Sequence, residues 1–69
     1  MSERGKFMIY CAEQYKLNKN LTGKELEKLF SDYDVWSYVY SCYDALHTTG
    51  TNYIINDIDG FIEEHRTVS

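Results

Sequence analysis

Proline is absent from the sequence, and cysteine is rare. The chain contains no proline and only two cysteines among its 69 residues. Without proline, no residue forces a helix to kink or end, because proline removes a helical hydrogen bond and clashes with the preceding turn. Cys11 and Cys42 form neither the C-x-x-C pair typical of a metal site nor the framework of a disulfide-rich domain. We therefore interpret both as thiols packed inside helices, and we identify no metal site and no cofactor.

Long hydrophobic runs are also absent. No stretch is long enough to span a bilayer, and the N-terminus lacks the apolar segment of a secretory signal. Together with the two unpaired cysteines, these absences predict a cytoplasmic protein in a reducing compartment, with no membrane association.

Positive charge is scarce in one half of the chain. Residues 1–30 carry six basic and four acidic side chains, whereas residues 31–69 carry Arg66 alone against seven acidic side chains. The second half disfavours nucleic acid as a partner, because binding to a phosphate backbone relies on lysine and arginine. The same acidic charge is compatible with a basic protein surface.

The residues that are plentiful indicate one small globular domain over residues 1–69. A hydrophobic content of 43% is too high for a disordered chain. The aromatic content is 16%, and seven tyrosines are more than a core of this size can bury. Chains this short often need a disulfide, a metal or a partner for stability.

Two helices are predicted in the first half. Apolar residues recur at helical spacing from about residue 3 to residue 19, and a polar Asn-Lys-Asn break follows. Thr22 and Glu25 then form the capping-box pattern, in which each side chain binds the other residue's backbone N–H at the start of a helix. The second helix is predicted to reach about Asp32.

Two more helices are predicted in the second half, which gives an all-α bundle of about four short helices. Asp34 is the expected N-cap of a helix over residues 35–47. The last helix has its apolar spacing over residues 54–65. Residues 53–56 are rich in β-branched side chains and leave a short extended segment open as an alternative.

The stretch from Leu46 to His65 holds features that resemble ligand sites. Its D-x-D-G string fits positions 3, 5 and 6 of a calcium loop, but Ile55 and Arg66 would then occupy the ligand positions 1 and 12, so we predict no calcium site. His47 lies in the last turn of a helix, where an imidazole can bind free carbonyls. Gly50 is predicted to end that helix in the left-handed conformation.

A protein-interaction surface is the preferred functional interpretation, and no small-molecule substrate is evident. The helix over residues 35–47 carries a second apolar stripe with Tyr38 and Cys42, and tyrosine and tryptophan are common at interfaces. The candidate contact residues are Trp36, Tyr38, Cys42, Tyr53, Asp57, Asp59 and Glu63. The partner is either another protein or a second copy of the chain. The alternative is a helix-turn-helix regulator that binds nucleic acid; it is weaker because the second of its two helices begins without lysine or arginine.

Three runs of the sequence carry a resemblance to a known family: FMIYCAEQYK, LTGKELEKLF and ALHTTGTNYIINDID. Through these runs, the sequence resembles the small bacterial family called Domain of Unknown Function 3791. The resemblance extends from about Lys6 to Glu64. It implies a stand-alone cytosolic protein that is often encoded beside a second small protein resembling ADP-ribosyltransferases. This neighbourhood implies an antitoxin-like or accessory partnership, and the resemblance assigns no activity and no residue roles. The preferred function is therefore non-enzymatic.

Overall fold

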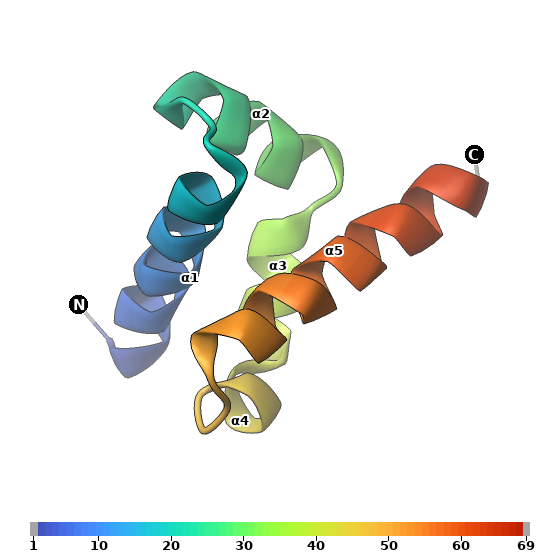
Figure 1. Ribbon diagram of the computed structural model, residues 1–69. Helices are drawn as coiled ribbons and strands as arrows, with labels where there is room; N and C mark the ends of the chain where they lie inside the picture. Colours follow the sequence, from blue (N-terminus) through green and yellow to red (C-terminus); the bar gives the residue numbers. More distant parts are fainter. Residues whose placement is uncertain (1, 69) are drawn as a thin grey trace.

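The computed structural model describes residues 2–68, with side chains up to residue 66, and contains only helices in this range (Figure 1). The helices are α1 (Glu3–Lys19), α2 (Gly23–Asp32), α3 (Val35–Ser41), α4 (Tyr43–Leu46) and α5 (Thr51–Val68). The all-α prediction is confirmed. The extended alternative for residues 53–56 is wrong, because this segment lies inside α5.

Local capping chemistry explains how α1 ends and α2 begins. Asn20 adopts the left-handed conformation (φ 57°). Its N–H donates to the Leu17 carbonyl at 3.3 Å, and the next N–H, of Leu21, donates to the Lys16 carbonyl at 2.9 Å, which is a Schellman motif. The predicted capping box is confirmed. The Thr22 hydroxyl accepts from the Glu25 N–H at 3.1 Å, and the Glu25 carboxylate accepts from the Thr22 N–H at 2.8 Å.

The single helix predicted over residues 35–47 is interrupted by a turn at Cys42, which separates α3 from α4. Near this turn the Tyr40 carbonyl accepts a hydrogen bond from the Arg4 guanidinium of α1 at 2.7 Å. Asp34 precedes α3 as predicted, but its side chain makes no capping hydrogen bond and its own backbone is left-handed (φ 54°). The prediction of an Asp34 side-chain cap is therefore wrong, because an N-cap side chain reaches the N–H groups of the first turn from an extended backbone.

The connection from α4 to α5 also differs in part from the sequence prediction. The His47 ring nitrogen Nδ1 lies 2.8 Å from the Tyr43 carbonyl, so the predicted role of His47 at a helix end is confirmed. The prediction for Gly50 is wrong, because no glycine of the described residues has a positive φ. Instead, the Gly50 carbonyl accepts from the Ile54 N–H at 3.1 Å, which places Gly50 at the start of α5.

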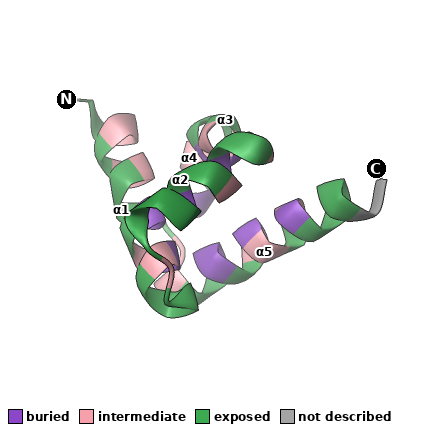
Figure 2. Ribbon diagram, turned by 90° about the horizontal axis from the view of Figure 1, so that it is seen from above, coloured by how far each residue is buried: buried purple, intermediate pink, exposed green. Residues whose placement is uncertain are grey.

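Helix α3 is the centre of the bundle, because it packs against all four other helices. Helix α1 also packs against α2 and α5. The core is formed by side chains from all five helices: Cys11, Ala12, Tyr15, Leu26, Phe30, Val35, Val39, Leu46, Ile54, Ile55, Ile58 and Ile62. In Figure 2 the buried positions of α5 lie on the side that faces the other helices, whereas its C-terminal end extends away from them.

Within the part of the chain that the structure describes, no helix is both long enough and apolar enough to cross a membrane.

Candidate interaction site

Tyr38, the central residue of the predicted surface, joins α3 to α5. Its ring stacks on Phe61 with centroids 4.0 Å apart, and its hydroxyl donates to an Asp57 carboxylate oxygen at 2.5 Å. Partial burial, and then the hydrogen bond to Asp57, raise the pKa of Tyr38 above its usual value. Both Tyr38 and Asp57 therefore make contacts within the chain.

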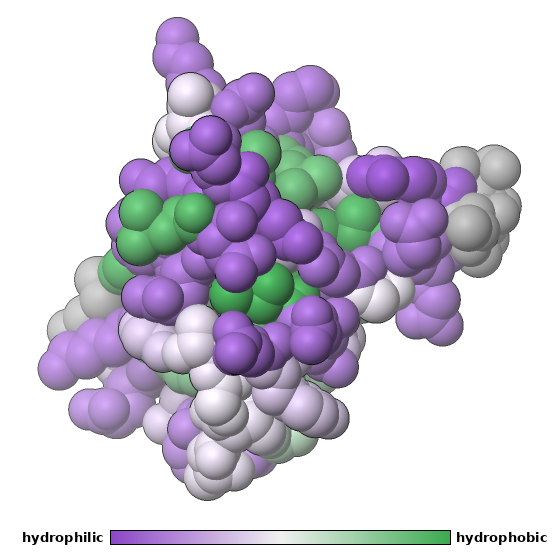
Figure 3. Space-filling model, in the orientation of Figure 1, coloured by the Kyte–Doolittle hydropathy of each residue, from purple (hydrophilic) through white to green (hydrophobic). Residues whose placement is uncertain are grey.

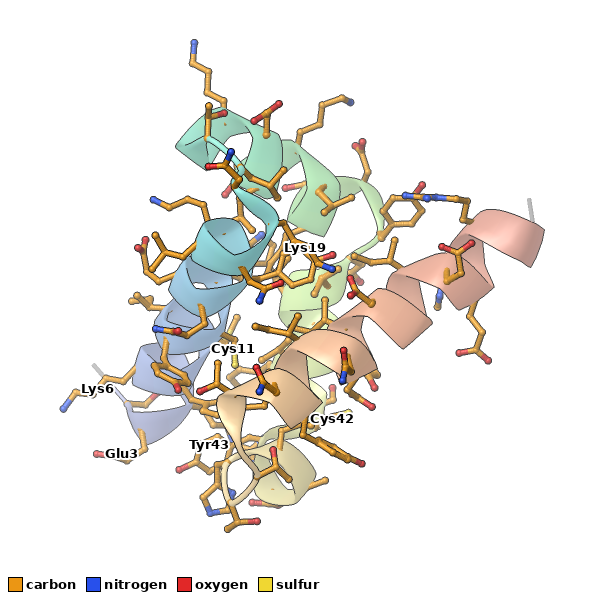
Figure 4. The ribbon with its side chains drawn as sticks, viewed as in Figure 1. Glu3, Lys6, Cys11, Lys19, Cys42 and Tyr43 are labelled. Atoms are coloured by element: carbon orange, nitrogen blue, oxygen red, sulfur yellow. The ribbon has the colours of Figure 1, made fainter. Side chains whose placement is uncertain are left out.

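A second tyrosine–aspartate pair joins α1 to α5. The Tyr15 hydroxyl donates to one carboxylate oxygen of Asp59 at 2.6 Å, and the Lys19 ammonium donates to the other at 2.7 Å. Figure 4 shows Lys19 at the C-terminal end of α1, with its side chain directed toward α5. Burial, and then the hydrogen bond to Asp59, raise the pKa of Tyr15. Asp59 thus has its main contacts inside the molecule.

The other four predicted contact residues lie in different surroundings. Trp36 is half-buried and packs edge-on against Phe30, with centroids 5.0 Å apart. Cys42 is half-buried at the turn between α3 and α4. Tyr53 is 59% exposed. Glu63 is exposed and forms an ion pair with Arg66 at 3.7 Å. The seven residues therefore do not form one continuous free surface.

The structure instead contains a groove between α3 and the C-terminal half of α5, with the α2–α3 connection at one end. This α3–α5 groove has a volume of about 750 Å³ and is lined by Asp32, Tyr33, Asp34, Ser37, Tyr38, Ser41, Phe61 and His65. Of these, only Tyr38 was among the predicted contact residues. Ser37 and Ser41 form the narrow polar strip of an otherwise apolar helical segment, which is the sequence signal for an open side of α3.

The charges of the α3–α5 groove are mainly negative. Asp32 forms an ion pair with Lys28 at 3.0 Å on the surface of α2. The carboxylate of Asp34 is exposed, and within the described residues it has neither an ion-pair nor a hydrogen-bond partner. At the same end, the Arg66 guanidinium lies 6.0 Å from the centroid of the Tyr33 ring, and a hydrogen bond with Tyr33 raises the pKa of Arg66. A cation of this chain therefore already rests against one aromatic residue of the groove.

Smaller depressions lie elsewhere on the surface. One of about 540 Å³ is lined by Tyr15, Lys19, Leu29, Asp59, Gly60, Ile62, Glu63 and Arg66. Two others are smaller still. One, of about 320 Å³ between α1 and α3, is mainly apolar and is lined by Met8, Trp36, Ser37, Tyr40 and Ser41. The other, of about 360 Å³, is lined by Glu3, Lys6, Phe7, Tyr10, Tyr43 and His47, of which Figure 4 labels Glu3, Lys6 and Tyr43. In the last of these depressions the His47 ring stacks on Tyr43 at 4.5 Å, and the Nδ1 contact with the Tyr43 carbonyl occupies one of its two ring nitrogens.

The thiols and carboxylates do not gather into a ligand set. Within the described residues, no three histidine, cysteine, aspartate or glutamate side chains are placed to hold a metal ion. Cys11 is buried in α1, and burial raises the pKa of its thiol to about 11, so the nucleophilic thiolate is scarce at neutral pH. Figure 4 shows Cys11 and Cys42 on separate elements.

Comparison with known proteins places most of the chain in a protein family. The family model described as "Protein of unknown function (DUF3791)" matches residues 6–65, which is most of the chain. No curated protein and no solved structure matches the sequence.

Proposed function

We propose that this chain, which belongs to the family described as protein of unknown function (DUF3791), is a non-enzymatic protein-interaction module of the cytoplasm. The supporting observation is the placement of its tyrosines. Of the seven, only Tyr15 is buried; the other six are exposed or half-exposed, among them Tyr40 (51%) and Tyr53 (59%). Tyrosines are frequent at protein interfaces, because they bury a large apolar area and keep one polar group satisfied.

The hydropathy of the face shown in Figure 3 favours a polar, transient contact over a permanent apolar one. On the face shown in Figure 3, hydrophobic residues occur as separate small groups among hydrophilic ones. Permanent interfaces resemble a domain core cut in half and need a continuous apolar area, whereas transient interfaces are more polar. The partner that fits such a surface is a protein with basic side chains, because the carboxylates of Asp32 and Asp34 line the α3–α5 groove.

The first partner to test is the protein encoded next to the gene, in line with the antitoxin-like or accessory role that the family resemblance implies. Self-association is the simpler form of the same proposal. The two proteins are co-expressed with an affinity tag on one of them, and co-purification is measured. In parallel, the mass of this chain alone is followed by sedimentation over a range of concentrations.

Co-purification at a fixed ratio, or a concentration-dependent increase in mass, is the expected result. A monomer at all concentrations that retains no neighbour-encoded protein would refute the proposal. Tight binding to duplex DNA with a steep salt dependence would instead support the nucleic-acid alternative. That result is not expected, because no lysine or arginine occurs between Lys28 and Arg66.

A further inference from the structure

We infer that the α3–α5 groove binds an arginine-containing segment of a partner protein, in an extended conformation along α3. This inference rests on the proposed function and deepens it by assigning a surface and the chemistry of the segment that binds there.

The groove combines an aromatic wall with a polar rim. Tyr38 stacks on Phe61, and Phe61 packs against the His65 ring with centroids 4.2 Å apart, so the three rings form a continuous column between α3 and α5. Along the rim, Ser37 and Ser41 lie one turn apart on the same face of α3, and Asp34, the residue before the first turn of α3, lines the same groove. A bound segment thus meets aromatic side chains together with hydroxyl and carboxylate acceptors.

The charge of the groove selects a cation. Asp32 and Asp34 contribute its two carboxylates, and only Asp32 has a cationic partner, Lys28, whose side chain is largely exposed. Asp57 does not line the groove, but its carboxylate accepts the hydrogen bond of the Tyr38 hydroxyl. Among the described residues, the lining of the groove includes no lysine or arginine, and the nearest arginine, Arg66, lies against Tyr33 at one end. A positively charged segment is therefore the occupant with complementary charge.

The chain holds its own arginines with the same groups that the groove presents. The Arg4 guanidinium lies 5.2 Å from the Tyr40 ring centroid and 5.1 Å from that of Tyr43, and it pairs with Asp44 at 3.7 Å. Arg66 rests near Tyr33, a residue of the groove itself. A planar guanidinium stacks on aromatic rings and binds carboxylates in a fork, which a lysine ammonium cannot do, so arginine is preferred to lysine.

The dimensions of the groove suit a short segment. The rim from Asp34 to Ser41 is about 10 Å long, at about 1.5 Å per helical residue. An extended chain covers this distance with about three residues at roughly 3.3 Å each. One or two arginines of a linear segment can therefore contact the groove at the same time.

The test is an NMR titration of the full-length chain with a short capped peptide that contains two arginines separated by one serine. Backbone signals of the groove-lining residues on α3 and α5 are expected to shift most. Asp34→Asn is the main variant, because asparagine tolerates the left-handed backbone as aspartate does and removes only the charge. Loss of one carboxylate near a guanidinium is expected to weaken binding about fivefold.

Asp44→Asn is the matched control. It removes the same charge from the same half of the chain at a site outside the groove, where the side chain is 85% exposed. Its effect is expected to stay below about twofold. Ser37→Lys, at an exposed position of the rim, places a cation in the groove and is expected to abolish measurable binding. The folding of each variant is checked by its helical circular dichroism and melting temperature.

Equal weakening by Asp34→Asn and Asp44→Asn would overturn the inference, because it would show unspecific charge attraction. So would absence of binding, or equal affinity for argininamide, since a single small cation would then suffice. A co-purified partner that Ser37→Lys leaves bound would also overturn the inference about the groove while the proposed interaction function stands. If no partner co-purifies and the chain stays monomeric, the proposed function fails.

Discussion

The Tyr15–Asp59 contact makes a quantitative prediction about how α5 is held on the bundle. Tyr15→Phe removes only the hydroxyl that donates a hydrogen bond to Asp59. Asp59→Asn removes the negative charge of the carboxylate that accepts this hydrogen bond. The ring of Tyr15 is buried and packs against Phe30 at a centroid distance of 5.5 Å, so phenylalanine keeps the apolar contacts of the core. The two changes and their combination form a double-mutant cycle.

The magnitude follows from the geometry of the contact. A hydrogen bond to a charged group contributes about 1.5–3 kcal/mol. Because the Asp59 side chain is 37% exposed, water replaces part of the lost interaction, and the lower end of this range applies. We expect Tyr15→Phe to lower the free energy of unfolding by about 1.5 kcal/mol. In a domain of this size, each kcal/mol lowers the melting temperature by about 4–8 °C.

Asp59→Asn is expected to lower the free energy of unfolding slightly more than Tyr15→Phe does, because it also weakens the ion pair with Lys19. An ion pair this exposed contributes only about 0.2–1 kcal/mol. The double variant should be less destabilised than the sum of the two single variants, with a coupling energy of about 1 kcal/mol.

The assay is urea and thermal unfolding at neutral pH, followed by circular dichroism. Tyr53→Phe is the control, because the Tyr53 side chain is 59% exposed and its hydroxyl makes no hydrogen bond within the described residues. Its stability should equal that of the parent chain. Strict additivity of Tyr15→Phe and Asp59→Asn, or an equal loss in Tyr53→Phe, would refute the assignment of this contact as an interhelical connection.

Three further predictions concern single positions, each measured by urea unfolding. Burial raises the pKa of Cys11 to about 11, so the thiol is neutral in both the folded and the unfolded state at pH 7. The folded state keeps its proton to a higher pH than the unfolded state, so the free energy of unfolding falls as pH rises from about 9 to 11. Cys11→Ala should be less stable than the parent at neutral pH, and this difference should shrink at high pH; a constant difference would contradict the shift. Gly60→Ala should stabilise the chain by about 0.5–1 kcal/mol, because Gly60 lies inside α5 and an added Cβ has open space; a loss of stability would contradict this. Thr22→Ala should destabilise it by about 1 kcal/mol through loss of the capping box, and Lys24→Ala, two positions later and exposed, should have little effect.

Features set by neighbouring residues could be predicted from the sequence. The bounds of α1 agree with the predicted range, because apolar spacing and the polar break at its end act within a few residues. The Thr22–Glu25 capping box likewise involves residues only three apart. Such signals reach no further than one helical turn, and they determine where helices begin and end.

Features that depend on distant residues could not be predicted. The turn at Cys42 lies beside a contact between Arg4 and the Tyr40 carbonyl, which are 36 residues apart in the chain. The left-handed backbone of Asp34 belongs to a tight connection in which its N–H donates to the Ser31 carbonyl at 3.3 Å. Aspartate is common both at N-caps and in left-handed positions, so its identity alone does not distinguish the two.

The same limit applies to the candidate site. Asp57 and Asp59 were predicted to face a partner, because acidic residues on a helix normally point to solvent. Side chains two residues apart on a helix point in directions that differ by about 200°, so the carboxylates of Asp57 and Asp59 face opposite sides of α5. One binds Tyr38 on α3 and the other binds Tyr15 on α1, at sequence separations of 19 and 44 residues. Only the packed bundle shows that they connect helices.

This use of carboxylates inside the molecule narrows which acidic residues can meet a partner. In the second half of the chain, Asp57 and Asp59 bind tyrosines, while Asp32, Asp44 and Glu63 form ion pairs with basic side chains. Glu64 also interacts within the molecule. Asp34 is then the acidic residue of this half whose carboxylate has no partner among the described residues, and it lies at the rim of the α3–α5 groove. The net charge of the second half of the chain is therefore a poor guide to its binding surface. The carboxylate of Asp34 is the position at which a substitution tests that surface most directly.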